Sequence, residues 1–177
     1  MTSNFLYRIS GYAALLASVF LLITGLGLMS KSPEISGFMA FSILGAVAHV
    51  LFIFIAMGFY FRQAEQLGWL GLVGFVTITI GNLIFTAGQY ISAYISLSDN
   101  PFGVGITLLP LGLLIFALIN DKAGDHPRLA AWLMFFGPAL NLFSSYSDAF
   151  SSPVLLQILL FSAGLILTGL FLVKKYS

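Results

Sequence analysis

Three polar side chains stand near the centres of long apolar runs, where polar groups are rare. They are His49, Asn82 and Asn141, each in a different run. An unpaired amide or imidazole in hydrocarbon costs several kcal/mol, and hydrogen bonding between such groups removes much of that cost. We therefore expect the three to face one another at one depth, with Thr86 and Gln89 one or two turns further out on the helix of Asn82.

Such a cluster has three interpretations. It can hold helices together, it can bind the head group of a small apolar or amphipathic ligand, or His49 can ligate the metal of a tetrapyrrole such as a porphyrin or chlorin. A bis-histidine haem would need a second histidine within the membrane. The other histidine, His126, falls between two apolar runs with Asp121 and Asp125, which we interpret as a solvated loop without a metal site.

The sequence lacks the residues that several classes of function require. The chain has no cysteine, which excludes disulfides and thiolate ligands. No Asp, Glu, Lys or Arg lies near the centre of an apolar run, which argues against ion-coupled transport and ion conduction. There is no G-x-S-x-G motif and no basic cluster for nucleic acid. We therefore expect a protein that is not an enzyme and has no nucleic-acid partner.

The composition sets the fold class. Of 177 residues, 59% are hydrophobic and only 7% are charged, against about 25% charged in a soluble domain. A membrane span needs roughly 20 residues. We expect one all-α transmembrane domain over residues 1–177, a polytopic six-helix bundle in the lipid bilayer. Its spans are predicted at about 9–29, 38–61, 70–95, 102–119, 129–146 and 154–173.

Small residues at seven-residue intervals mark two of these spans. Gly74, Gly81 and Gly88 define one edge of the third span, and the first span carries the equivalent seam, which is Gly11, Ser18 and Gly25. Small residues allow helix backbones to approach closely within a membrane. We expect the third span to be central and its glycine edge to take a close neighbour, with the seam of the first span as the favoured partner.

The basic residues predict the orientation. With six spans, both termini share one side, and that side holds six of the seven Lys and Arg residues, leaving only Lys31 opposite. Basic residues in short loops favour the cytoplasmic side, so both termini are expected to be cytoplasmic. Trp69 and Trp132 fall at the cytoplasmic ends of their spans, as interfacial tryptophans do.

Two stretches of the first half resemble known sequences. They are Tyr7-Arg8-Ile9-Ser10-Gly11 with the following Tyr12–Leu16, and Phe61-Arg62-Gln63-Ala64-Glu65 with the following Gln66–Phe75. Both resemble segments of a family of small multi-pass bacterial membrane proteins that has no assigned activity. The resemblance implies a bacterial inner (cytoplasmic) membrane and a hairpin linking spans two and three. It implies no catalytic residue and no cofactor.

The leading interpretation is a non-enzymatic bundle that binds a small apolar or amphipathic molecule around His49, Asn82, Thr86, Gln89 and Asn141. A second interpretation is an accessory subunit of a larger membrane complex, such as one that carries a pigment or a quinone. A third is the substrate-binding component of a transporter. A binding protein predicts a cavity lined by those side chains. A subunit predicts a filled core and an exposed seam at Gly11, Ser18 and Gly25 for a partner subunit.

Overall fold

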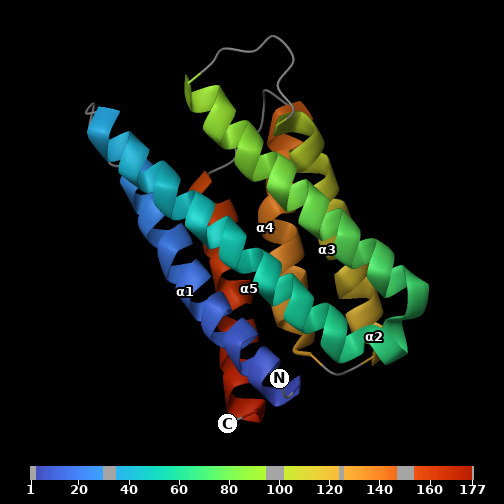
Figure 1. Ribbon diagram of the computed structural model, residues 1–177. Helices are drawn as coiled ribbons and strands as arrows, with labels where there is room; N and C mark the ends of the chain where they lie inside the picture. The colour runs from blue at the N-terminus through green and yellow to red at the C-terminus, as the bar shows by residue number, and fades with distance from the viewer. Residues whose placement is uncertain (1–2, 30–34, 95–101, 124–125, 147–153, 177) are drawn as a thin grey trace.

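The computed structural model describes residues 3–29, 35–94, 102–123, 126–146 and 154–176, and in this part of the chain the regular structure is α-helical. The helices are α1 (Ser3–Met29), α2 (Ile35–Tyr94), α3 (Phe102–Ala123), α4 (Arg128–Tyr146) and α5 (Val154–Lys175). Helix α2 is two helices joined at a sharp turn, so the chain folds into six helical segments (Figure 1). The six expected spans lie largely within these segments.

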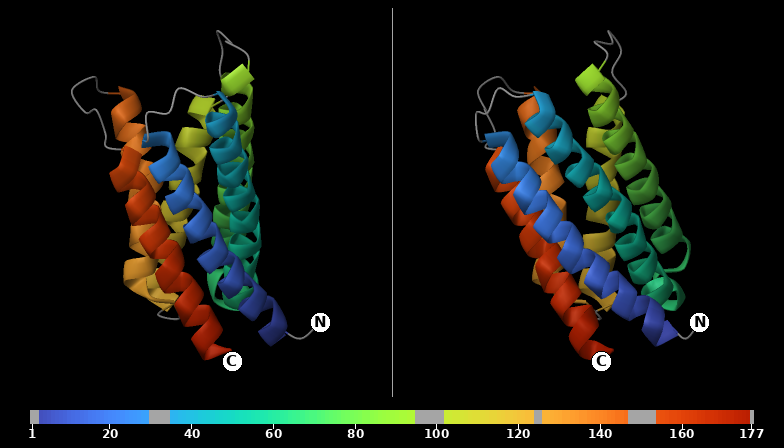
Figure 2. Two further views of the ribbon diagram at one scale, coloured as in Figure 1. Left: turned by 90° about the vertical axis from the view of Figure 1, so that its left-hand side faces the viewer. Right: turned by 60° about the vertical axis from the view of Figure 1, so that its left-hand side comes forward.

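The turn within α2 occurs at Gly68. Its backbone has φ 53° and ψ −146°, a region that only glycine occupies readily. A Cβ at this position would meet no atom within 4 Å, so the backbone conformation alone requires glycine. The turn divides α2 into an N-terminal arm (residues 35–67) and a C-terminal arm (residues 69–94), which run antiparallel as a hairpin (Figures 1 and 2).

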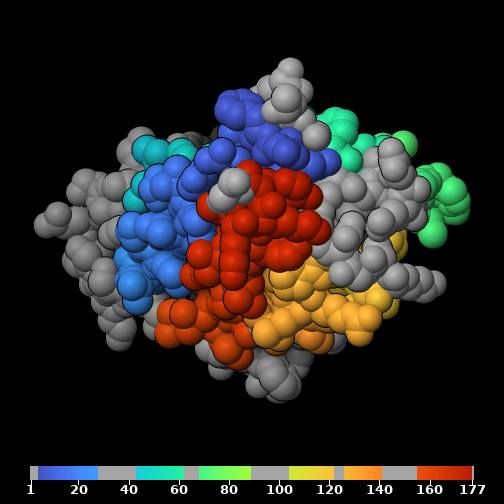
Figure 3. Space-filling model, turned by 90° about the horizontal axis from the view of Figure 1, so that it is seen from below, coloured from blue at the N-terminus to red at the C-terminus, as the bar shows by residue number. Residues whose placement is uncertain are grey.

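The six segments form a closed ring. In chain order, α1 contacts α2, α2 contacts α3, α3 contacts α4 and α4 contacts α5, and α5 returns to contact α1. Because the first and last helices are neighbours, the ends of α1 and α5 lie side by side (Figure 3). Tyr7 and Tyr176 meet there, with ring centroids 4.7 Å apart.

The glycine edge of the C-terminal arm packs against α3. A Cβ on Gly81 would lie 2.5 Å from the backbone nitrogen of Leu109, and a Cβ on Gly112 would lie 2.6 Å from the backbone nitrogen of Ile78. Each helix therefore needs glycine where the other approaches. Gly74 faces Ile115 and Gly112 in the same interface, and Gly88 is also buried.

The seam on α1 has a different partner from the one its spacing suggested. Gly11 packs against Leu172 and Val173, and Gly25 packs against Ile158, all on α5. Ser18, which lies midway between these two glycines in the sequence, is also buried. Its hydroxyl donates a hydrogen bond to the carbonyl of Leu15. The prediction that this seam meets the C-terminal arm of α2 is wrong, as is the prediction that it stays exposed for a partner subunit.

The bundle is apolar outside as well as inside. Large apolar side chains are exposed on all five helices, among them Leu26, Phe54, Leu83, Leu118, Phe136 and Leu170. Among the described residues, five segments are long and apolar enough to cross a membrane, and the described part of α4 adds a shorter apolar stretch, Arg128–Leu140. Polar residues such as Ser10, Asn82 and Thr168 are buried instead. This pattern fits a bundle surrounded by lipid, in which helix association relies on tight packing and internal hydrogen bonds.

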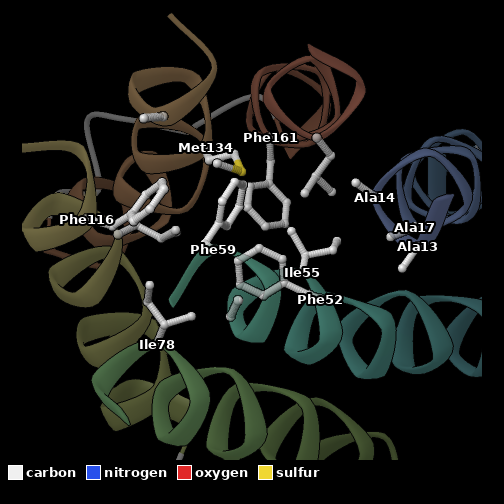
Figure 4. Packing of buried hydrophobic residues seen from close by; sticks show 14 of the residues in the cluster. Ala13, Ala14, Ala17, Phe52, Ile55, Phe59, Ile78, Phe116, Met134 and Phe161 are labelled. Carbon is white, nitrogen blue, oxygen red and sulfur yellow. The ribbon is translucent and has the colours of Figure 1, made fainter. Parts of the chain in front are cut away.

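Aromatic side chains fill the centre of the ring. Phe52 of the N-terminal arm reaches across to Phe161 of α5, with ring centroids 5.2 Å apart. About two helical turns further along the same arm, the ring of Phe59 contacts that of Phe116 of α3, with centroids 4.7 Å apart. Met134 of α4 is fully buried and lies among these rings (Figure 4). The core is thus closed at this level by large side chains rather than by backbone contact.

Candidate functional site

Two buried hydrogen bonds join the two arms of α2. His49 Nδ1 lies 2.7 Å from Asn82 Oδ1, and Asn82 Nδ2 donates a hydrogen bond to the backbone carbonyl of His49 at 2.8 Å. Both residues are buried, with Asn82 only 1% exposed. The turn at Gly68 brings them together, because it folds the arms so that their midpoints lie at one level.

The two hydrogen bonds define the tautomer of His49. A carbonyl only accepts, so the amide nitrogen of Asn82 must face the carbonyl of His49 and its oxygen must face the imidazole. The proton of a neutral His49 therefore resides on Nδ1, which leaves Nε2 as an acceptor. The ring of Phe85 packs against the imidazole, with centroids 5.1 Å apart.

Of the other three residues of the expected cluster, the structure describes the side chain of Thr86 alone. Thr86 is half-buried and donates its hydroxyl to the carbonyl of Asn82, one turn back on its own helix. The side chains of Gln89 and Asn141 lie outside the described residues. The structure therefore brings together His49 and Asn82, and it shows that Thr86 and the amide of Asn82 form hydrogen bonds with protein atoms.

An apolar niche lies away from this pair, toward the turn of α2. Both arms of α2, α3 and α4 contribute its walls, and the volume enclosed is about 20 Å³, the space of about one water molecule. Tyr60 and Phe75 stack there, with centroids 5.1 Å apart and planes 21° apart, and Gly71 and Gly74 leave room beside them. The lining residues are Phe52, Ala56, Phe59, Tyr60, Gly71, Gly74, Phe75, Ile78, Leu113, Ile115, Phe116, Ile119 and Met134.

The niche differs from the cavity that the sequence predicted. Its lining contains none of His49, Asn82 or Thr86, and the hydroxyl of Tyr60 is the sole polar side-chain group among its lining residues. Sequence reasoning missed this place because its residues are ordinary apolar ones. The available signal was a pair of glycines, Gly71 and Gly74, close to aromatic residues on either side of a tight turn.

His126 is buried, which corrects the expectation of a solvated loop. It is 3% exposed, and its ring contacts Phe59 at 4.7 Å, Phe171 at 5.6 Å and Phe116 at 6.0 Å between centroids. Its Nε2 lies 3.1 Å from the hydroxyl of Thr168 on α5. The connection between α3 and α4 is short, from Ala123 to Arg128, so the histidine is drawn into the end of the bundle.

Hydrogen bonds tie this connection to both helices. Asn120 donates to the carbonyl of His126 at 3.1 Å, and the carbonyl of Pro127 accepts from the backbone of Ala130 at the start of α4. Asp121 accepts from the indole of Trp132 at 3.1 Å. The guanidinium of Arg128 lies 3.9 Å from the same carboxylate. Asp121 is therefore engaged in protein contacts rather than free in a loop, while Asp125 lies outside the described residues.

In the part of the chain that the structure describes, no three His, Asp or Glu side chains come together in a group that could hold a metal ion. Comparison with models of protein families, with curated proteins and with solved structures found no match. Three places in the bundle have a geometry that bears on function, and they are the His49–Asn82 pair, the apolar niche and the surroundings of His126.

Proposed function

We propose that this protein is a non-enzymatic bundle of the bacterial inner membrane that binds a slender apolar or amphipathic molecule, such as a lipid chain, in the apolar niche. The observation that carries the proposal is the niche itself, which opens beside the stacked rings of Tyr60 and Phe75. Membrane interiors supply acyl and isoprenoid chains at high concentration. A recess with apolar walls and a single hydroxyl suits such a chain.

The niche must widen to accept a chain. Its present 20 Å³ is well below the roughly 300–1,000 Å³ of sites for larger ligands. Tyr60, Phe75 and Ile119 are only half-buried, so their rings and side chains have room to rotate away. Aromatic rings turn about two side-chain angles, and burial of apolar ligand surface offsets the contacts that they give up.

The His49–Asn82 pair has a different role in this proposal. The amide of Asn82 forms hydrogen bonds with the imidazole and with the backbone carbonyl of His49. Such contacts hold membrane helices together. We therefore assign the pair to the stability of the α2 hairpin. A ligand head group that reached His49 would have to replace these bonds with equivalent ones.

The proposed orientation has both termini in the cytoplasm. Arg8, Arg128, Lys174 and Lys175 lie at the end of the bundle that also holds the termini and the turn at Gly68 (Figure 1). Basic residues favour the cytoplasmic face. Trp69, which is 72% exposed next to the turn, would then sit in the cytoplasmic interface with its ring among the lipid head groups.

The test uses a fatty acid that carries a photoreactive diazirine, incorporated into membranes that contain the full-length protein. After irradiation, cross-linked peptides are identified by mass spectrometry. The proposal expects labelling of the α2 turn region and the second half of α3, concentrated on niche residues. Ile119→Phe should reduce it, because the larger side chain fills the opening.

A matched control separates the niche from general contact with lipid. Ile166 on α5 is also half-buried and does not line the niche, so Ile166→Phe makes the same change elsewhere. Labelling spread evenly over exposed apolar residues, or reduced equally by both variants, would show that chains only surround the bundle. The seam on α1 that the accessory-subunit alternative would offer to a partner packs against α5.

A further inference from the structure

We propose that His126, Met134 and Thr168 form a binding site for a soft monovalent metal cation, Cu(I) or its analogue Ag(I). The site shares Met134 with the wall of the apolar niche, but metal binding does not depend on a lipid chain entering that niche. It lies near the basic end of the bundle, where the α3–α4 connection meets α5 (Figure 1). Three donor atoms from three different parts of the chain meet there.

The first donor is Nε2 of His126. The other ring nitrogen, Nδ1, lies 3.1 Å from the carbonyl of Pro127, and because a carbonyl only accepts, the ring proton belongs on Nδ1. The lone pair of Nε2 is then directed at the hydroxyl of Thr168, 3.1 Å away. A metal-binding histidine commonly donates its second ring nitrogen to a carbonyl in this way, which fixes the ring for coordination.

The second donor is the thioether of Met134, and the third is Thr168 itself. The sulfur lies 3.9 Å from the same Thr168 hydroxyl oxygen. An imidazole nitrogen from the α3–α4 connection and a thioether sulfur from α4 therefore approach one hydroxyl on α5. A cation held between these atoms would face nitrogen, sulfur and the oxygen of the intact hydroxyl, whose hydrogen would turn away from His126. Its bonds would be roughly 2.0 Å to nitrogen and 2.3 Å to sulfur, as for zinc. Only a small shift of Met134, an unbranched and adaptable side chain, would be needed to close the coordination.

The donor set selects the class of metal. Thioether and imidazole are soft to intermediate ligands, a combination that favours Cu(I) over hard cations such as Mg²⁺ or Ca²⁺. All three donors are neutral. Burial of one positive charge among neutral ligands costs far less than burial of two, so a monovalent ion suits the site better than Zn²⁺.

The apolar side chains around the three donors also favour a weakly hydrated cation. Phe59, Phe116 and Phe171 lie around the imidazole, and Thr168 and Met134 are fully buried. Such an apolar shell keeps out water and thereby disfavours strongly hydrated ions. Cu(I) and Ag(I) tolerate low coordination numbers and bind well in such a place.

The test titrates Ag(I), which needs no reducing agent, into the purified full-length protein without a polyhistidine tag, and measures binding by isothermal calorimetry. Cu(I) is then tested by competition with bicinchoninate under anaerobic conditions. The proposal expects saturable binding of one ion per chain. Met134→Leu, which preserves the volume of the side chain, should weaken binding at least tenfold. Met57→Leu, on α2 and outside the cluster, should leave the affinity unchanged.

X-ray absorption at the copper edge gives a second, independent measurement, with nitrogen and sulfur expected in the first shell. Since His126→Gln removes a packed ring, its folding is checked by circular dichroism, and Met134→Leu provides the decisive comparison if the histidine variant unfolds. Lack of saturable binding, equal affinity for wild-type protein and Met134→Leu, or a copper spectrum without sulfur would each overturn the proposal.

Discussion

The pairing of His49 with Asn82 makes a quantitative prediction about the stability of the α2 hairpin. Asn82→Leu removes both hydrogen bonds between the arms and leaves Nδ1–H of His49 buried without its partner. Interhelical hydrogen bonds in membrane proteins contribute about 0.6 kcal/mol each and up to about 1.7. An unpaired buried donor adds about 1–3 kcal/mol. We expect Asn82→Leu to lower the free energy of unfolding by about 2–4 kcal/mol.

The geometry also predicts an asymmetry between the two partners. His49→Leu removes only the imidazole bond, because Asn82 Nδ2 donates to the backbone carbonyl of His49, which the substitution retains. The loss should therefore be smaller than for Asn82→Leu. In the double variant His49→Leu/Asn82→Leu, no imidazole donor remains to be satisfied, so its loss should be less than the sum of the two single losses by about 1–2 kcal/mol.

The assay is equilibrium unfolding in mixed micelles of a mild detergent and SDS, followed by circular dichroism, for the wild type and the three variants. Thr86→Val serves as a control on the same arm, since its hydroxyl bonds only to the carbonyl of Asn82 within the helix; a change below about 1 kcal/mol is expected. Additive losses, or a larger loss for His49→Leu than for Asn82→Leu, would refute the two-bond arrangement.

Three further predictions use the same unfolding measurement. The hydroxyl of Ser162 is buried without a hydrogen-bond partner in the described structure, so Ser162→Ala should stabilise the bundle by up to about 1 kcal/mol, and a clear loss would indicate a missed partner. Gly68→Ala should cost about 1–3 kcal/mol from backbone conformation alone, since no atom lies near its Cβ; an unchanged stability would contradict the turn. Gly81→Ala should cost more than Gly68→Ala, because its Cβ meets the backbone of Leu109; equal losses would argue against close packing of α2 on α3.

The sequence predicted the helices better than it predicted which helices pack against each other. Long apolar runs, Gly68 and the absence of charge at span centres were sufficient to indicate a helical membrane bundle with a hairpin in its first half. Matching depth was enough to suggest that His49 and Asn82 meet. The seam at Gly11 and Gly25, by contrast, shows only that some helix approaches closely. It does not show which one, and the structure assigns α5.

The surroundings of His126 could not be predicted for a related reason. A histidine beside acidic residues and a proline has the composition of a solvated loop, and burial there depends on where Phe59, Phe116 and Phe171 arrive from three other helices. These contacts join residues far apart in the chain. No local pattern encodes them, whereas the length of the connection between α3 and α4 offered a weak hint that it would be drawn inward.

Closure of the ring by α1 and α5 has a consequence for how the protein is made. During synthesis α1 enters the membrane long before α5, so the surface formed by Gly11, Ser18 and Gly25 has no α5 to pack against until α5 has been made. Until then it faces lipid, water or another nascent helix. A chain truncated before Val154 would therefore expose this seam to the insertion and quality-control machinery, which would distinguish chains that lack α5 from chains that contain it.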